Sequence, residues 1–278
     1  MALGGSADRG AGALERAILA LNSERPKDAE LIAGEVLKAD PRHTRALYIL
    51  GYALLMQGRP QEALAALELS VRGQHDPEIE TQLGIALRQV GRHKDALSRL
   101  KRATKRRPPF GPAFLELGSL LISFERYDEA IEALNRGVEV APMLLDLLIQ
   151  LGFVYLRCRN CANAKVAFAR VLNISPNSHT ALFGMAKAHQ EMGENRIAAE
   201  YFRRYLMSRP NDASAWLSLG HCLLELGDRN AGFECFRTVA RSDPKRYGDA
   251  IASLVKSARG RFWLKPSAAA QFLSGTKN

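Results

Sequence analysis

The chain has few cysteines, few aromatic side chains and no long apolar run. Four of its 278 residues are Cys and 7% are aromatic, and four Cys are too few for a disulfide scaffold of this length. No apolar run approaches the roughly 18 residues of a membrane span. The apolar stretch at residues 14–21 is broken by Glu15 and Arg16, so no signal peptide is predicted. We therefore expect a cytoplasmic protein with reduced thiols.

The remaining composition is that of a folded protein. Apolar residues make up 47% and charged residues 24% of the chain, which excludes the low hydrophobicity of disordered chains. With so few aromatics, the core must consist mainly of Ala and Leu. The net charge is +10, and a basic surface of this kind favours an acidic partner.

Two sets of residues recur with a period of 34. Five prolines are spaced at this interval: Pro108, Pro142, Pro176, Pro210 and Pro244. Three glycines share the period: Gly84, Gly118 and Gly152. Two sets in phase indicate a true internal repeat. The predicted repeats are 10–43, 44–76, 77–110, 111–144, 145–178, 179–212 and 213–246, preceded by a flexible terminus at 1–9.

Particular repeat positions hold one kind of residue throughout. Position 8 is always small: Ala17, Gly51, Gly84, Gly118, Gly152, Ala186 and Gly220. Position 20 is also always small: Ala29, Ala63, Ala96, Ala130, Ala164, Ala198 and Gly232. The i, i+3, i+4 spacing of apolar residues predicts two helices in each repeat. The small residues would let the two backbones approach closely where the helices cross.

Punctuating residues predict where these helices end. Gly58, Gly91, Gly193 and Gly227 occupy position 15, where a glycine can terminate the first helix. A proline at position 32 prevents the second helix from continuing. Each hairpin leaves an apolar face that only the next hairpin can cover, so the pattern predicts an all-α solenoid.

The pattern resembles the tetratricopeptide repeat (TPR) family over about 10–246. Trp216, Leu219 and Gly220 match the opening signature of that family well, whereas the first repeat is degenerate, with Arg16 at position 7. The resemblance implies a right-handed superhelix of about seven repeats. It also implies a non-enzymatic scaffold that binds a peptide or protein in a concave groove lined by the first helices.

The predicted groove is semi-apolar and would suit an acidic or amphipathic partner. It lacks the Lys/Asn/Arg clamp of chaperone-binding relatives, because position 9 is never Asn. It also lacks the Asn ladder of glycosyltransferase relatives at position 6. The groove candidates are Tyr48, Tyr52, Gln82, Arg88, Leu115, Glu116, Ile149, Gln150, Phe153, Arg157, Phe183, Lys187 and His221. We expect Tyr48, Tyr52, Phe153 and Phe183 to be partly exposed there.

Positive charge is concentrated between residues 88 and 107. The basic patch predicted there comprises Arg92, Lys94, Arg99, Lys101, Arg102, Lys105, Arg106 and Arg107, with Arg88 just before them and Asp95 as the single acid. The patch contains no aromatics, so base stacking is not expected. It is either a solvated outer face or a contact for an acidic partner. Reversal of Arg99, Arg102 and Arg106 should then change stability by no more than about 1 kcal/mol.

No catalytic motif is present, and no cofactor or metal site is predicted. Cys158 and Cys161 form a Cys-x-x-Cys at the turn between two predicted helices. A redox role would need a βαβ unit, and a zinc site would need a second pair. Both thiols are interpreted as ordinary turn and packing residues.

Two other functions remain open at this stage. One is a recruiting or regulatory subunit for a separate enzyme of the glycosyl- or sulfotransferase type. The other is an electrostatic binder of nucleic acid, which the basic net charge and the run at residues 88–107 support, although the absence of aromatics from that run makes nucleic acid an unlikely partner. The sequence carries no prediction of the oligomeric state.

The C-terminal segment is unusually apolar. Residues 247–258 are predicted to form an amphipathic capping helix, and 259–278 form a tail. Phe262, Trp263, Leu264 and Phe272 are too apolar to remain in water. We expect them to pack around Phe233, Phe236 and Leu254, or to dock onto a partner or onto a second copy.

Overall fold

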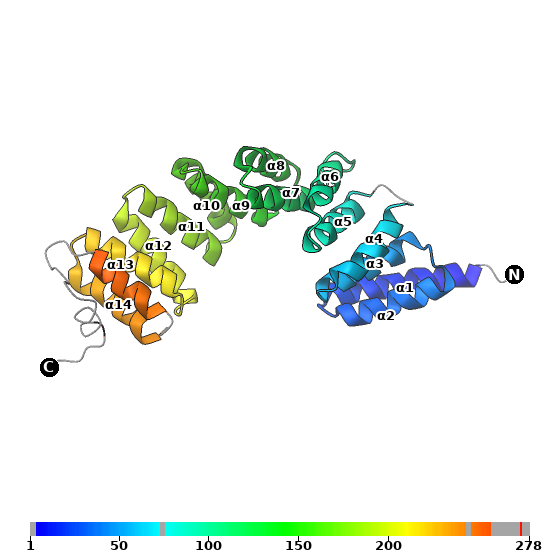
Figure 1. The fold of residues 1–278 in the computed structure, drawn as a ribbon, viewed down its shortest axis with the longest axis horizontal. Coiled ribbons are helices and arrows are strands. Elements are labelled where there is room, and N and C mark those ends of the chain that lie inside the picture. Colours follow the sequence, from blue (N-terminus) through cyan, green and yellow to red (C-terminus); the bar gives the residue numbers. More distant parts are fainter. Residues whose placement is uncertain (1–3, 73–75, 243–245, 257–272, 274–278) are drawn as a thin grey trace. The chain divides into compact units, whose positions relative to one another are not determined.

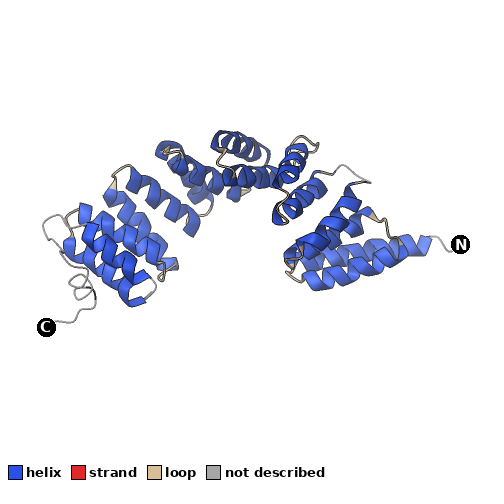
Figure 2. Ribbon diagram, in the orientation of Figure 1, coloured by secondary structure: helices blue, strands red, loops and turns tan. Residues whose placement is uncertain are grey.

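The computed structural model describes residues 4–72, 76–242, 246–256 and 273. These residues form fifteen helices and no strand (Figure 2). The chain divides into two compact units, residues 1–147 and 148–278, and the boundary falls within α9. In each unit, successive helices follow one another as hairpins (Figure 1).

The first unit contains four hairpins. Their helices are α1 (Gly4–Asn22), α2 (Pro26–Ala39), α3 (Thr44–Met56), α4 (Pro60–Val71), α5 (Pro77–Gln89), α6 (His93–Ala103), α7 (Gly111–Ser123) and α8 (Tyr127–Val140). The first helices of these hairpins also pack side by side, α1 on α3, α3 on α5 and α5 on α7. Tyr48 and Leu50 pack against two apolar clusters of this unit and so connect them.

The second unit contains three hairpins and a final helix. Their helices are α9 (Leu145–Arg157, from Leu148 onward), α10 (Cys161–Ile174), α11 (His179–Glu191), α12 (Asn195–Ser208), α13 (Ala213–Glu225), α14 (Arg229–Ser242) and α15 (Tyr247–Lys256). Trp216 packs against both of its described apolar clusters.

The first helices begin where the repeat register places them. From α3 to α13, each starts at the first residue of a predicted repeat. In four cases the residue just before accepts a hydrogen bond from a backbone N–H of the first turn: His43, Asp76, Ser178 and Asp212. Such caps satisfy amide groups that the helix itself leaves free. The first helix of the chain departs from this rule: α1 begins at Gly4, ahead of the predicted repeat start at residue 10. Residues 4–9 are therefore helical and not the flexible terminus that was predicted.

The small residue at position 8 accommodates a side chain rather than a backbone. A Cβ added at Gly118 would lie 2.6 Å from Leu134 Cδ2, and one added at Gly152 would lie 2.6 Å from the Phe168 ring. Leu134 and Phe168 both occupy position 24 of their own repeats. The expectation that small residues at 8 and 20 let the two backbones approach closely holds at position 20 of the last repeat, where a Cβ on Gly232 would lie 3.0 Å from the Gly220 carbonyl oxygen. At position 8, the nearest atoms are those of a side chain. The glycine at position 8 leaves room for the side chain at position 24 of the same hairpin.

Position 15 adopts a left-handed backbone in all seven repeats. Four repeats have glycine there, with φ between 72° and 86°, and the other three have Glu24, Glu125 and Arg159 at φ 56–59°. A side chain in this conformation costs roughly 1–2 kcal/mol. The turn geometry therefore does not depend on glycine, and three repeats sustain it with strain.

This strain predicts opposite effects at two turns. Gly58→Ala should lower the free energy of unfolding by about 1 kcal/mol, and Glu125→Gly should raise it by about 0.5 kcal/mol after the added chain entropy of glycine. A Cβ at Gly58 meets no atom within 4 Å, so backbone conformation alone is tested. Urea denaturation of both variants measures the effect. Equal stabilities for both variants and the wild type would contradict the strain.

The capping helix is present and packs on α13 and α14. Ala250 is fully buried in a cluster with Phe236 and Val239. Leu273 is also buried in this cluster, so one residue of the apolar tail lies against the last hairpin. Phe262, Trp263, Leu264 and Phe272 lie outside the described residues, as do residues 257–258 and the side chain of Leu254.

Candidate functional site

A cavity of about 820 Å³ lies beside the first helices of the first unit. Tyr48 and Tyr52 of α3 form part of its wall, with their ring centroids 6.3 Å apart. The other lining residues come from α1, the α2–α3 connection, the first turn of α3, and α5 with its N-cap: Ile18, Leu21, Asn22, Asp40, Arg42, His43, Thr44, Arg45, Asp76, Glu78 and Ile79. Both tyrosines are half-buried, so their rings belong to the fold and also face the cavity.

Tyr48 is held in place by α5. Its hydroxyl donates a hydrogen bond of 2.7 Å to Glu78 Oε1. Burial raises the pKa of Tyr48 well above its usual range, and the hydrogen bond to Glu78 adds to this effect. The hydroxyl therefore stays protonated at all physiological pH values and acts as a fixed donor.

The remaining candidates of the first unit form the surface of α5 and α7. Arg88 donates to Glu116 across these helices at 3.1 Å. Gln82 and Leu115 are half-buried on the same helices. The predicted groove residues Arg88 and Glu116 thus bind each other, which leaves less of their charge available for a partner.

Lys187 is the centre of the candidate site in the second unit. Its Nζ donates to Ser218 Oγ at 2.9 Å and to Gln190 Oε1 at 3.2 Å. It lies 5.8 Å from the ring centroids of both Phe183 and Phe202. Burial lowers the pKa of this amine. Two of the three donors of the ammonium are used in these hydrogen bonds.

The other candidates of the second unit surround aromatic contacts. Phe153 packs edge-on to Phe168 at 5.1 Å, and His221 lies 5.3 Å from Phe236. Phe183 contacts Tyr205 at 5.2 Å. The rings of Phe153 and Phe183 are half-buried, like those of Tyr48 and Tyr52. Ile149 and Gln150 are half-buried and Arg157 is exposed.

The basic run proves to be partly structural. Five of its nine cations are in ion pairs: Arg88 with Glu116, Arg92 with Glu68 and Asp95, Lys101 with Glu129, and Arg102 and Arg106 with Glu80. Lys94, Arg99, Lys105 and Arg107 make no ion pair within the described residues. The predicted patch is therefore not one uniform solvated face.

Glu80 is a buried carboxylate that binds two of these arginines. Its side chain is fully buried, and Oε1 accepts from Arg102 at 3.1 Å and Arg106 at 3.0 Å. Its Oε2 has no partner in the described part of the chain. The expectation that Arg102 and Arg106 lie on a solvated outer face is therefore corrected, because both bind a fully buried carboxylate, and we now predict that reversal of their charges is destabilising.

The cysteines form no candidate site in the described residues. Cys158 follows α9 and Cys161 begins α10, at the turn where they were expected. Cys161 lies within 3.5 Å of Glu191, and burial raises its pKa. Burial also raises the pKa of Cys222 and of Cys235 to about 11, so none of these three thiols is activated. No group of residues suited to a metal ion is found in this part of the chain.

Several site residues were missed by the sequence argument. Arg42, Arg45 and Glu78 join Tyr48 only because three successive repeats meet. Glu80 had a sequence signal, because position 4 holds Leu47, Phe114, Leu148, Leu182 and Trp216 in other repeats. A carboxylate among these apolar residues indicated a buried charge that needed partners.

None of the helices in the described ranges has the length and apolar character needed to cross a membrane. A search among curated proteins finds no match to this chain. Solved structures share its fold at low identity. They include the C-terminal part of a TPR repeat-containing protein from Cytophaga hutchinsonii (13% identity, 87% of this chain and 99% of that one, TM-score 0.68).

Two further structures are similar. One is a tetratricopeptide repeat protein from Parabacteroides merdae (16% identity, 83% of this chain and 98% of that one, TM-score 0.58). The other belongs to the APC/C hetero-tetramer Cut9–Hcn1 (16% identity, 85% of this chain and 47% of that one, TM-score 0.66). The profile of the tetratricopeptide repeat matches residues 14–77, 81–142 and 183–245. With its helical hairpins in the predicted register, the chain belongs to the tetratricopeptide repeat family.

Proposed function

We propose that this protein is a non-enzymatic scaffold that binds a peptide or protein partner on its first helices. The family consists typically of such scaffolds. The observation that carries the proposal for this chain is the cavity of about 820 Å³ walled by Tyr48 and Tyr52. Its size is in the range of specific ligand pockets. Tyrosine supplies both apolar contact and a hydrogen-bonding group, which makes it frequent among binding hot spots.

The charges differ between the two candidate regions. In the first unit, Arg42 and Arg45 line the cavity together with Asp40, Asp76 and Glu78, and these three acids accept hydrogen bonds from Arg42 N, Glu78 N and the Tyr48 hydroxyl. The cavity therefore suits a partner that carries apolar groups and charges of both signs. In the second unit, the Lys187 ammonium lies beside the Phe183 and Phe202 rings, and a carboxylate next to an apolar side chain would suit it.

The alternative functions have less support. Electrostatic binding of nucleic acid depended on the basic run, and five of its nine cations already bind carboxylates. A role as recruiting subunit for a separate enzyme is compatible with the same surface. No observation on the described residues favours it over a general scaffold.

Removal of one groove ring tests the proposal. We expect Tyr52→Ala and Phe153→Ala each to weaken partner binding at least tenfold, since aromatic hot spots contribute about 2 kcal/mol or more. Affinity capture from the source cell would identify the partner, and calorimetry with the purified pair would give Kd. Circular dichroism should show an unchanged helix content.

Matched controls come from exposed residues of the second helices. Leu31 of α2 is 67% exposed and Val166 of α10 is 61% exposed. Leu31→Ala and Val166→Ala should leave Kd unchanged. If the groove variants bind as tightly as these controls, the partner does not use the first helices.

A further inference from the structure

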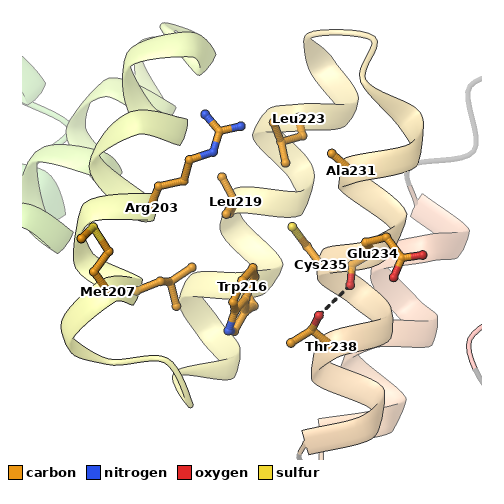
Figure 3. A pocket seen from close by; sticks show the side chains of 10 residues that line it. Arg203, Met207, Trp216, Leu219, Leu223, Ala231, Glu234, Cys235 and Thr238 are labelled. Atoms are coloured by element: carbon orange, nitrogen blue, oxygen red, sulfur yellow. Dashed lines mark hydrogen bonds between the residues drawn. The ribbon is translucent and has the colours of Figure 1, made fainter.

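A second apolar groove lies in the second unit, and none of the predicted groove residues lines it. It has a volume of about 500 Å³ and runs between α12 and α14, with α13 as its floor (Figure 3). We call it the outer groove. It is lined by Arg203, Leu206 and Met207 of α12, by Trp216, Leu219 and Leu223 of α13, and by Ala231, Glu234, Cys235 and Thr238 of α14.

The outer groove is apolar at its base. Leu206, Leu219, Leu223 and Cys235 are each no more than 5% exposed. Trp216 forms part of the wall, and its indole N–H donates to the Pro210 carbonyl at 2.7 Å. This hydrogen bond fixes the ring, so the groove is preformed.

Met207 stands at the rim and is 84% exposed, more than any other large apolar side chain of the described residues. Met is a flexible and polarizable residue that adapts to apolar partners. Its exposure beside an apolar groove indicates a surface that another molecule covers.

The helices on both sides of the groove are positively charged. The α12 helix carries Arg196, Arg203 and Arg204 against Glu200, or three minus one. The α14 helix carries Arg229, Arg237 and Arg241 against Glu234, again three minus one. Glu234 is already paired with Arg237, whereas Arg203 makes no ion pair in the described part. The groove therefore presents an uncompensated cation beside an apolar base.

We propose that the outer groove binds an acidic amphipathic helix of a partner protein. A helix in a groove places apolar side chains at i, i+3, i+4 and i+7 on the base. Its flanking carboxylates would bind Arg203 and the basic faces of α12 and α14. A second copy of this chain fits less well, because a symmetric contact would bring two like-charged helix pairs together.

Trp216 provides a direct readout. The chain has two Trp residues, so Trp263→Phe leaves Trp216 as the single indole. The probe is a synthetic helical peptide of about four turns, with Leu at the four helical positions and Glu at the flanks. We expect a saturable blue shift of Trp216 emission that weakens as salt is added. A peptide with Lys in place of Glu should bind at least tenfold more weakly. Equal binding of the Glu and Lys peptides would overturn the assignment of an acidic partner.

Two pairs of variants locate the contact. Arg203→Glu should weaken binding of the Glu peptide about tenfold, because it replaces an attraction between charges by a repulsion of similar size. Its control is Arg170→Glu on α10, an exposed residue of the same unit where the same charge change is made on neither of the helices that flank the groove. Met207→Glu should also weaken binding, and its control is Met143→Glu, at a residue that is 72% exposed in the first unit. Equal losses within either pair would overturn the proposal.

Two other results separate this proposal from its alternatives. Tyr52→Ala and Phe153→Ala should leave binding of the Glu peptide unchanged, so failure of the first-helix proposal would not affect this one. Light scattering of the protein alone should show no association that depends on Met207. A dimer that Met207→Glu dissociates would assign the groove to a second copy and contradict the proposal.

Discussion

Replacing Arg102 and Arg106 together by Glu is expected to lower the free energy of unfolding by about 3–5 kcal/mol, as the loss of partners for a buried charge does. Both arginines donate to Oε1 of Glu80, which is fully buried. The variant leaves this carboxylate without compensation and adds two like charges beside it. Chemical denaturation followed by circular dichroism measures the loss.

The same helix region offers a matched control. Arg99 and Lys105 make no ion pair within the described residues, and Arg99→Glu with Lys105→Glu changes the net charge by the same amount. Surface substitutions of this kind usually change stability by about 0.5 kcal/mol or less. Equal losses in the two double variants would mean that overall charge, and not Glu80, sets the effect.

A rescue experiment isolates the buried carboxylate. Adding Glu80→Gln to the Arg102→Glu, Arg106→Glu variant removes the buried charge and should recover a large part of the lost stability. In the wild-type background Glu80→Gln should cost less, because Arg102 and Arg106 are 44% and 31% exposed and can be hydrated. Additive effects of the substitutions would show that Glu80 and the arginines are not coupled.

Gly118→Leu is expected to destabilise the first unit by about 3 kcal/mol, the upper end of the usual range for overpacking. Its first added atom, Cβ, would already lie 2.6 Å from Leu134 Cδ2 and 2.7 Å from Leu134 Cγ. Leu134 is itself fully buried, so it has no free space to enter. The melting temperature should fall by about 2–4 °C for each kcal/mol lost.

Gly34→Leu is the control for this substitution. Gly34 lies within α2, and a Cβ there meets no atom within 4 Å. Leu favours a helix interior over Gly by roughly 0.5–1 kcal/mol, so the control should be neutral or stabilising. If Gly118→Leu and Gly34→Leu have the same melting temperature, the contact between positions 8 and 24 is not a packing constraint.

The sequence alone was enough to predict the repeating fold. Pro and Gly restrict the backbone locally, and their 34-residue spacing located the ends of the helices before any contact was known. The first helices from α3 to α13 start at the first residues of the predicted repeats. Small residues at position 8 marked the helix crossings because a buried crossing admits only a limited side-chain volume.

The sequence was less informative where function depends on neighbours from different repeats. It selected Tyr48 and Tyr52, but not Arg42, Arg45 and Glu78, which come from adjacent segments of the fold. It grouped Arg102 and Arg106 with solvated cations, since a run of positive charge looks alike whether or not it binds a buried acid.

The division between the two sources of information has a physical reason. Helix boundaries and hairpin packing follow from local backbone preferences and from a periodic apolar pattern, both of which can be read along the chain. Ion pairs such as that of Glu80, cavities and the outer groove depend on which side chains converge from helices far apart in sequence. The sequence by itself therefore determined the repeat, the helices and the family, and only the tertiary structure decided which charges are bound and which surfaces are free.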